Sequence, residues 1–372
     1  DITVILMKNF NSIAHLGGRF FAGVLCILPY AAYTSDISDI QPYLYTDVFA
    51  RSEPISVMDT IHGWKGDHQR GEKQYIYSWF ETGAKLNNWG LGVLYRRDYA
   101  LNFSGDTSEL YGAIRNDEDL PTGRTYDVNL KAHAITAKGL RLSWENEWQP
   151  SFKTTIGLSF LQSNYLIEGD LNGTATATGA KEYEYNADVN YAYSDDILFE
   201  RELTEKVVGY GGALDLAFDW QLSANWQNHT EFRDLLAALW WKNAPYTEAV
   251  AYSDRQHTSD SGYTTWDPLV SGTEKNYSTY RQTLPVRIDT QFIYQENTWQ
   301  YGAGLQYQFE DYVPRIGIGQ ETGNWQVFAW YRPIDQSIEL TTRWHQTEVG
   351  FGMDNLRWDD AKFIHIRISY AY

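Results

Sequence analysis

The sequence predicts an all-β fold, a transmembrane antiparallel up-and-down β-barrel of about 14 strands. Three observations lead to this prediction. Apolar and polar residues alternate along many segments of about ten residues, the length that a tilted membrane-crossing strand needs. Short turns alternate with long polar segments along the chain. The sequence also ends in an alternating segment whose last residue, Tyr372, is aromatic.

The alternation is clearest in four segments, in which apolar side chains share one face and polar side chains the other. These segments are Tyr126–Ala134, Leu284–Tyr294, Trp299–Glu310 and Ile338–His345. In the third, the apolar face runs from Trp299 to Phe309 and the polar face from Gln300 to Glu310. We expect each apolar face to contact lipid and each polar face to line the lumen.

The turns and loops differ in length in the way that outer-membrane barrels require. Short turns with Asn close to Trp are expected on the periplasmic side, where the Trp rings would form an aromatic girdle. They occur at 86–89, 223–226, 296–299 and 322–325. The long polar segments, expected outside the cell, are 52–73, 101–124, 166–205 and 241–275.

Strands placed between these turns and loops number fourteen, an even number with both termini periplasmic. They are 40–51, 74–86, 89–100, 126–148, 152–166, 206–222, 226–240, 276–295, 299–311, 313–321, 325–332, 336–346, 347–353 and 361–372. A break at Gly139 would change the count, so that twelve or sixteen strands stay open. The alternating segment 182–193 is either a hairpin above the membrane or a barrel strand that lines the lumen with three carboxylates.

The composition agrees with a membrane barrel. Aromatic residues make up 16% of the chain, with 15 Trp and 28 Tyr, which suit a membrane–water interface. Mean hydropathy is −0.48, and beyond the N-terminal region no apolar run reaches the length of a transmembrane helix. A net charge of −18 argues against nucleic acid as a partner.

The N-terminal region is predicted to be a targeting segment. Lys8 and Arg19 precede the apolar run 20–28, and a small-residue end follows at Ala31 and Ala32. We therefore divide the chain into upstream residues and signal peptide, 1–32, and a barrel, 33–372. The single cysteine, Cys26, falls in the targeting segment, so cysteine catalysis and thiolate metal sites are not expected. No cofactor, metal site or catalytic residue is predicted.

The last strand carries a resemblance. Its alternate residues from Ile364 to Tyr372 are apolar, and His365 and Arg367 lie on the other face. This segment resembles the C-terminal signature of Gram-negative outer-membrane β-barrels. The resemblance implies a location in the bacterial outer membrane and recognition by the barrel-assembly machinery. No narrower family matches. The strand count is similar to that of long-chain fatty-acid transporters, but only about seven residues, 33–39, would stand where their plug lies.

The inward positions read from the alternation are rich in charge. The lumen-lining candidates are Lys131, His133, Arg141, Asp215, Asp219, Arg287, Asp289, Glu310, Glu339, Arg343, His345, His365 and Arg367. Opposed acidic and basic rows would orient polar solutes in a transverse field. Alternatively, these charges pair across the lumen and fill a narrow barrel.

The leading functional hypothesis is a porin-like channel for small polar solutes. One alternative is the outer-membrane component of an export or assembly system. Another is a rim-located lipid-modifying enzyme, for which His229, Glu231 and Arg233 share one face. Expected partners are outer-membrane lipid, lipopolysaccharide and small polar solutes, and the oligomeric state is left open.

Overall fold

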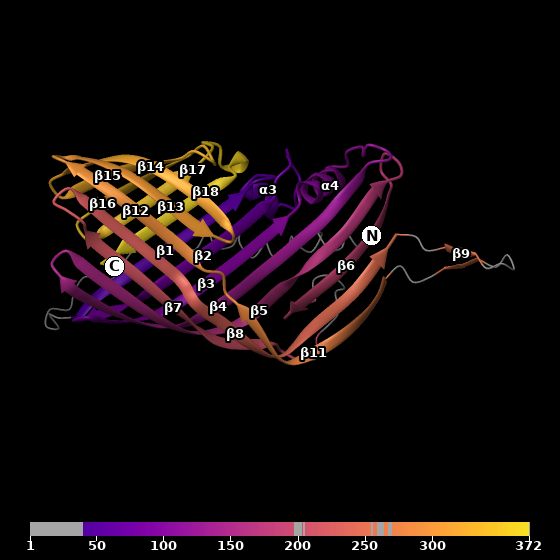
Figure 1. Cartoon of the computed structure of the whole chain (residues 1–372), viewed down its shortest axis with the longest axis horizontal. Coiled ribbons are helices and arrows are strands. Elements are labelled where there is room, and N and C mark those ends of the chain that lie inside the picture. Colours follow the sequence, from indigo (N-terminus) through magenta and orange to yellow (C-terminus); the bar gives the residue numbers. More distant parts are fainter. Residues whose placement is uncertain are drawn as a thin grey trace.

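The computed structural model describes residues 40–196, 203, 205–253, 256–258, 264–266 and 270–371, and its elements are labelled as in Figure 1. The helical elements are α3 (Val57–Ile61), α4 (Gly105–Arg115) and η2 (Trp358–Asp360). The strands of the first half are β1 (Ile40–Ser52), β2 (Lys73–Leu86), β3 (Trp89–Phe103), β4 (Thr125–Gln149), β5 (Phe152–Ala177), β6 (Tyr183–Tyr193), β7 (Val208–Gln221) and β8 (Trp226–Tyr252). Those of the second half are β9 (Gln256–Thr258), β10 (Thr264–Trp266), β11 (Val270–Thr283), β12 (Arg287–Glu296), β13 (Trp299–Gln308), β14 (Asp311–Thr322), β15 (Trp325–Arg332), β16 (Ser337–Trp344), β17 (Thr347–Met353) and β18 (Phe363–Tyr370).

Sixteen strands form one antiparallel sheet that closes on itself. The last strand, β18, pairs with β1 from Leu44 opposite Tyr370 to Arg51 opposite Phe363. The strands β6 and β7 share one position between β5 and β8, and β11 and β12 share another beside β8. The barrel therefore has fourteen strands around its circumference, closed by the pairing of β18 with β1, and the predicted count is confirmed.

The strand predicted at 276–295 is wrong in one respect, because the structure divides it into β11 and β12. Pro285 lies at the break and has no backbone N–H to donate to a neighbouring strand. The adjacent strand β8 bulges at the same level, where Asp234 has a positive φ of 57°. The break and the bulge together bend the wall.

The two sides of the barrel differ in height (Figure 1). The tall wall contains β4, β5 and β8, which are 25 to 27 residues long, whereas the strands β12–β18 of the short wall have 7 to 12 residues. The segment 182–193 contributes β6, which pairs with both β5 and β8 and so belongs to the wall. It lies in the extension above the short wall, where Glu184 and Asp188 are exposed to solvent.

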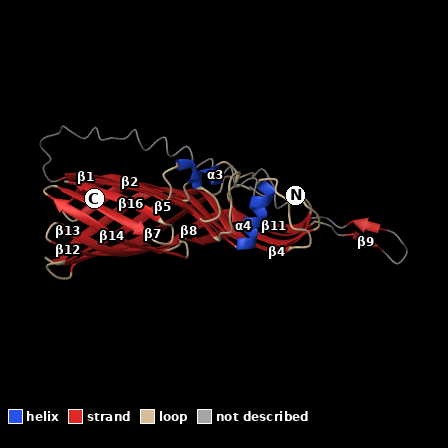
Figure 2. Cartoon of the chain, turned by 90° about the horizontal axis from the view of Figure 1, so that it is seen from above, coloured by secondary structure: helices blue, strands red, loops and turns tan. Residues whose placement is uncertain are grey.

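The alternating segment Tyr126–Ala134 does not face lipid as predicted. Its apolar side chains are buried in a hydrophobic core together with Leu110 and Tyr111 of α4 and with Trp64. The reason is that the predicted outer loop 101–124 contains a helix that packs on this face of the extension, at the end of the barrel seen in Figure 2. This part of β4 therefore supports a cap and does not cross the membrane.

The outer surface of the barrel proper is apolar. Large side chains exposed on it include Leu140, Phe160, Ile316 and Leu340, which are between 53% and 67% exposed. At the short-turn end the exposed rings form the predicted girdle, made of Trp89, Trp148, Trp220, Trp226, Trp299, Trp325 and Trp344. A closed barrel with an apolar band and an aromatic girdle is the architecture of outer-membrane proteins. The chain is a bacterial outer-membrane β-barrel.

Some expectations fall on other parts of the chain. The predicted signal peptide, 1–32, and the terminal Tyr372 lie outside the described residues. No helix in the described part of the chain is both long and apolar enough to span a membrane.

The apolar band predicts a position-dependent cost of charge. We expect Ile316→Arg, which places a cation in the band, to lower the free energy of unfolding by about 2–4 kcal/mol. Gln320→Arg, on the same face but beside the short turn, should cost at most about 1 kcal/mol. Guanidinium unfolding in phospholipid vesicles measures both, and equal costs would contradict the assigned lipid-facing band.

The helix α4 should dock less firmly in acid. A hydrogen bond from the backbone N–H of Asp127 lowers the pKa of Asp106, and one from Arg124 lowers the pKa of Glu109. These two carboxyls have lower pKa values when α4 is docked. Their contribution to the docking free energy is therefore complete above their ordinary pKa and is lost as the pH falls through their lowered pKa values. Hydrogen-exchange protection factors of α4 should fall in acid, and less so in Glu109→Gln; pH-independent protection would refute this.

Candidate functional site

The interior of the barrel is built from every second residue of its strands. In β1 the inward residues include Asp47 and Phe49, and in β18 they include His365 and Arg367. The register places Asp47 opposite Arg367 and Phe49 opposite His365, so these four side chains share the inward face. The closure of the barrel thus brings a carboxylate, an imidazole and a guanidinium together.

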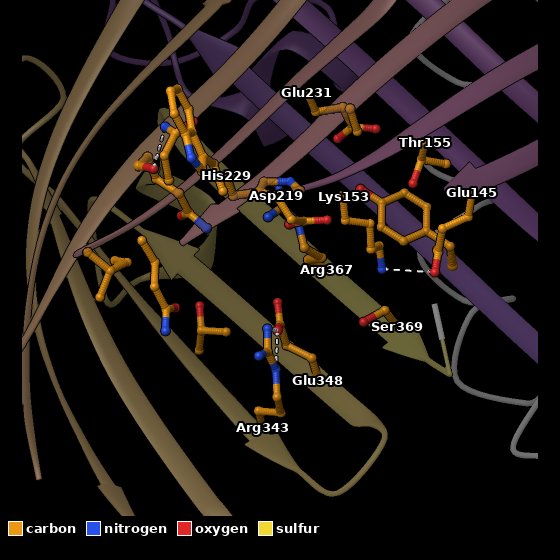
Figure 3. A pocket seen from close by; sticks show the side chains of 18 of the residues that line it. Glu145, Lys153, Thr155, Asp219, His229, Glu231, Arg343, Glu348, Arg367 and Ser369 are labelled. Atoms are coloured by element: carbon orange, nitrogen blue, oxygen red, sulfur yellow. Dashed lines mark hydrogen bonds and ion pairs between the residues drawn. The ribbon is translucent and has the colours of Figure 1, made fainter. Parts of the chain in front are cut away.

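A cavity of about 790 Å³ occupies the part of the lumen next to the short turns, which is called the lower end of the barrel. It reaches the short-turn end, because the turn residues Pro150, Ser151 and Gln346 are among its lining residues. Its volume lies in the range of small-molecule sites. Most of its lining side chains are polar or charged, as Figure 3 shows for ten of them.

Carboxylates from β7 and β8 face two arginines across this cavity. Asp219 and Glu231 come from β7 and β8, and Arg343 and Arg367 come from β16 and β18 (Figure 3). The strands β8 and β18 lie half the circumference apart in the strand order. Local ion pairs accompany both groups, such as Lys153 with Glu145 at 3.1 Å. The β7 and β8 side is therefore mainly acidic, whereas the β16–β18 side carries both signs, with Glu339 and Glu348 beside the two arginines.

A layer of side chains closes the cavity at its upper end. Above this layer lies a second, much smaller cavity of about 30 Å³, room for about one water molecule. Glu231 and Arg367 line both cavities and therefore lie between them. Arg367 is held loosely, because its ion pairs with Asp47 and Asp289 measure 3.6 Å and 3.5 Å.

His365 is the centre of a tighter network beside this layer. Its Nδ1 lies 2.9 Å from Glu339 Oε2, and its Nε2 lies 2.9 Å from Asp47 Oδ1. Arg332 donates to the same oxygen of Glu339, and the Tyr77 hydroxyl donates to Asp47 at 3.1 Å. All of these groups are buried, so each charge relies on its partners for solvation.

A second network lies on the tall wall around Asp234. Arg96 donates to both of its carboxylate oxygens, at 2.6 Å and 2.8 Å, and Arg287 donates to it at 2.8 Å. The backbone N–H of Asp234 donates to Asp215, which accepts from Arg141 at 3.1 Å. The β8 bulge is what directs the Asp234 carboxylate between the two guanidinium groups, since regular alternation would not place it there.

Eleven of the thirteen predicted lumen residues are wall residues, in the buried networks, along the cavity or higher up. Arg141, Asp215, Arg287, Asp289, Glu339, His365 and Arg367 lie in the buried networks, and Asp219 and Arg343 line the cavity. His133 lies higher, 3.7 Å from Glu168. Lys131 lies above the barrel proper, with its side chain 65% exposed.

Two candidates occupy hairpin turns and are not wall residues. Phe309 and Glu310 both have positive φ and form the turn between β13 and β14, so Glu310 leaves the wall and Phe309 is buried inside instead of facing lipid. His345, with a φ of 53°, lies in the turn between β16 and β17 at the mouth of the cavity. In both cases the alternation of apolar and polar residues continues into a two-residue turn. The positive φ values of such a turn end the strand, so the side chains there no longer follow the alternation.

Several site residues were missed by the sequence analysis. Arg96 and Asp98 follow Leu94 with a period of two, and Asp47 and Arg51 follow Tyr45 in the same way, so the signal was present in the alternation. The role of Asp234 had no such signal, because it depends on a bulge.

The residues considered for an enzyme are wall residues. His229 Nδ1 lies 2.6 Å from Asp219, and Glu231 accepts from Arg233 at 2.7 Å. His229, Glu231 and Arg233 are thus each paired with an oppositely charged wall residue beside the cavity.

Comparisons with known proteins give no family. No family model and no curated protein matches the sequence. Solved structures that align include the Pseudomonas putida toluene transporter TodX, at 10% identity, 90% of this chain, 88% of that chain and a TM-score of 0.42. The Ralstonia pickettii toluene transporter TbuX aligns at 9% identity, 88% of this chain, 76% of that chain and a TM-score of 0.31. Likenesses this weak do not indicate a solute.

The Asp234 network predicts a large cost for removing one partner. We expect Arg96→Met to lower the free energy of unfolding by about 3–5 kcal/mol, because the two buried carboxylates Asp98 and Asp234 then share Arg287 alone and one negative charge is uncompensated. Arg343→Met removes an arginine whose side chain is 57% exposed and pairs with Glu348. It should lower the free energy of unfolding by at most about 1 kcal/mol. Denaturant unfolding in vesicles compares the two, and similar costs would mean that the buried network does not stabilise the barrel.

Proposed function

We propose that this barrel is a channel for small polar solutes across the outer membrane. The observation that carries the proposal is the cavity of about 790 Å³, which is open at the short-turn end and places carboxylates from β7 and β8 opposite Arg343 and Arg367. A transverse field favours solutes that carry both charges or a strong dipole over apolar ones. The cavity acts as the solute chamber in this proposal.

In the same proposal, Arg367 forms the constriction. It lies between the large and the small cavity, and its ion pairs are long. By contrast, Arg332 and Arg96 are held by short contacts and are fully buried. Movement of the Arg367 side chain joins the two cavities at the lowest cost in broken contacts.

Conductance in planar bilayers tests the proposal. We expect small, ion-selective currents from the purified protein and a severalfold larger conductance from Arg367→Ala, because that change shortens the side chain between the cavities. Arg343→Ala is the matched control: it removes an arginine from the wall of the same cavity, away from the constriction, and should change conductance little.

A solute assay complements the currents. Liposomes that contain the protein should swell faster in a zwitterionic amino acid than in an uncharged solute of equal size. Absence of current and of swelling for both the parent and Arg367→Ala would refute the channel.

A further inference from the structure

A row of polar and basic side chains crosses the outer face of the tall wall. The strand registers align Lys138 with Gln162, Gln162 with Tyr210, Tyr210 with Trp240 and Trp240 with Arg281. Lys242 follows Trp240 by two residues on the same face. Together these six residues are called the basic row. In β8 the neighbours of Trp240, Leu239 and Trp241, are fully buried inside the barrel. Because successive side chains of a strand point to opposite faces, Trp240 and the residues aligned with it point outward.

The basic row marks the upper border of the apolar band. Immediately below it on the same face lie Leu140, Phe160 and Leu236, which are 53%, 67% and 71% exposed. Tyr210 and Trp240, 58% and 49% exposed, lie within the row and suit a headgroup environment. Since long loops are extracellular in such barrels, this border faces the outer leaflet.

Cations on the outer face are a feature of the tall wall. The arginines of the short-wall strands are Arg287, Arg315, Arg332, Arg343 and Arg367, and all of them belong to the interior networks or line the cavity. The short wall ends instead in outward residues such as Tyr312, Tyr331 and Ile338. The positive charge of the outer surface is therefore local, in a chain of net charge −18.

The basic row has cations available for a ligand. Lys138, Lys242 and Arg281 are exposed and form no ion pair with any residue that the structure describes. Glu205, at the same edge, contacts Asn243 at 3.4 Å. Exposed cations beside a lipid-facing band are stable only where their charged ends reach headgroups, and anionic headgroups attract them.

We propose that the basic row binds a phosphorylated glycolipid of the outer leaflet. Its acyl chains lie on Leu140, Phe160 and Leu236, and its phosphates contact Lys138 at one end of the row and Lys242 with Arg281 at the other. The row spans four strand spacings, about 19 Å, which fits a headgroup with two phosphates better than a single phosphate ion. Gln162, which donates to the Tyr210 hydroxyl at 3.2 Å, offers polar contacts to the sugar between them.

Binding of bisphosphorylated lipid A to the full chain in detergent, followed by native mass spectrometry, tests the proposal. The triple variant K138Q/K242Q/R281Q should bind on the order of 100-fold more weakly, about five-fold for each charge removed. The control variant K65Q/K181Q/R357Q removes three exposed cations from loops at the long-loop end and should bind like the parent. Equal losses in the two variants, or no loss in the first, would overturn the proposal.

Further measurements remain decisive if the triple variant does not fold. The charge-conserving variant K138R/K242R/R281K should retain binding. The unaltered protein should bind fully dephosphorylated lipid A much more weakly, and millimolar inorganic phosphate should not displace the bisphosphorylated lipid. Equal binding of the dephosphorylated lipid, or displacement by phosphate alone, would refute a headgroup site.

Discussion

The pairing of β18 with β1 is the constraint on which the rest of the interior depends. Its register brings Asp47 beside Arg367 and places His365 on the same inward face, where Glu339 completes the network. A shift by one residue would turn Ile364 and Ile366 inward and would expose His365 and Arg367 to lipid. Burying charge in hydrocarbon is far more costly than pairing it inside the barrel, so the ionic network and the apolar band select the same register.

The interior networks also give the lumen its shape. Arg96, Asp234 and Arg287 fill the tall-wall side with short contacts, and His365 with Glu339 fills the opposite side. A chamber is left below them and a small cavity above. Such paired charges keep the interior polar and rigid, so that a solute meets fixed dipoles on both sides of the chamber. The loosely held Arg367 is the exception, and its position between the cavities gives the barrel one element that can move at low cost.

The barrel could be predicted from the sequence because the alternation of apolar and polar residues along a strand is a local property of the chain. It predicted the strand count, the short-turn girdle at Trp89 and Trp325, and the closing strand. It failed where a neighbour in space decides the outcome. The stripe at Tyr126–Ala134 looks lipid-facing until α4 covers it, and the turn at Phe309–Glu310 continues the alternation although the strand has ended. The position of Asp234 follows from a bulge, which no local pattern encodes.

Arg367 and Glu231 lie between the chamber and the small cavity above it, and we hold that Arg367 is the side chain whose movement opens this layer at the lowest cost. Accessibility of a single cysteine tests it most directly. Thr155→Cys places a thiol in the chamber, and a charged, membrane-impermeant thiol reagent is added from one side of oriented vesicles. We predict that the thiol reacts rapidly with reagent on the short-turn side and slowly with reagent on the long-loop side. In the double variant that also carries Arg367→Ala, the slow reaction should become faster. Reaction from the long-loop side that is unchanged by Arg367→Ala would contradict the account.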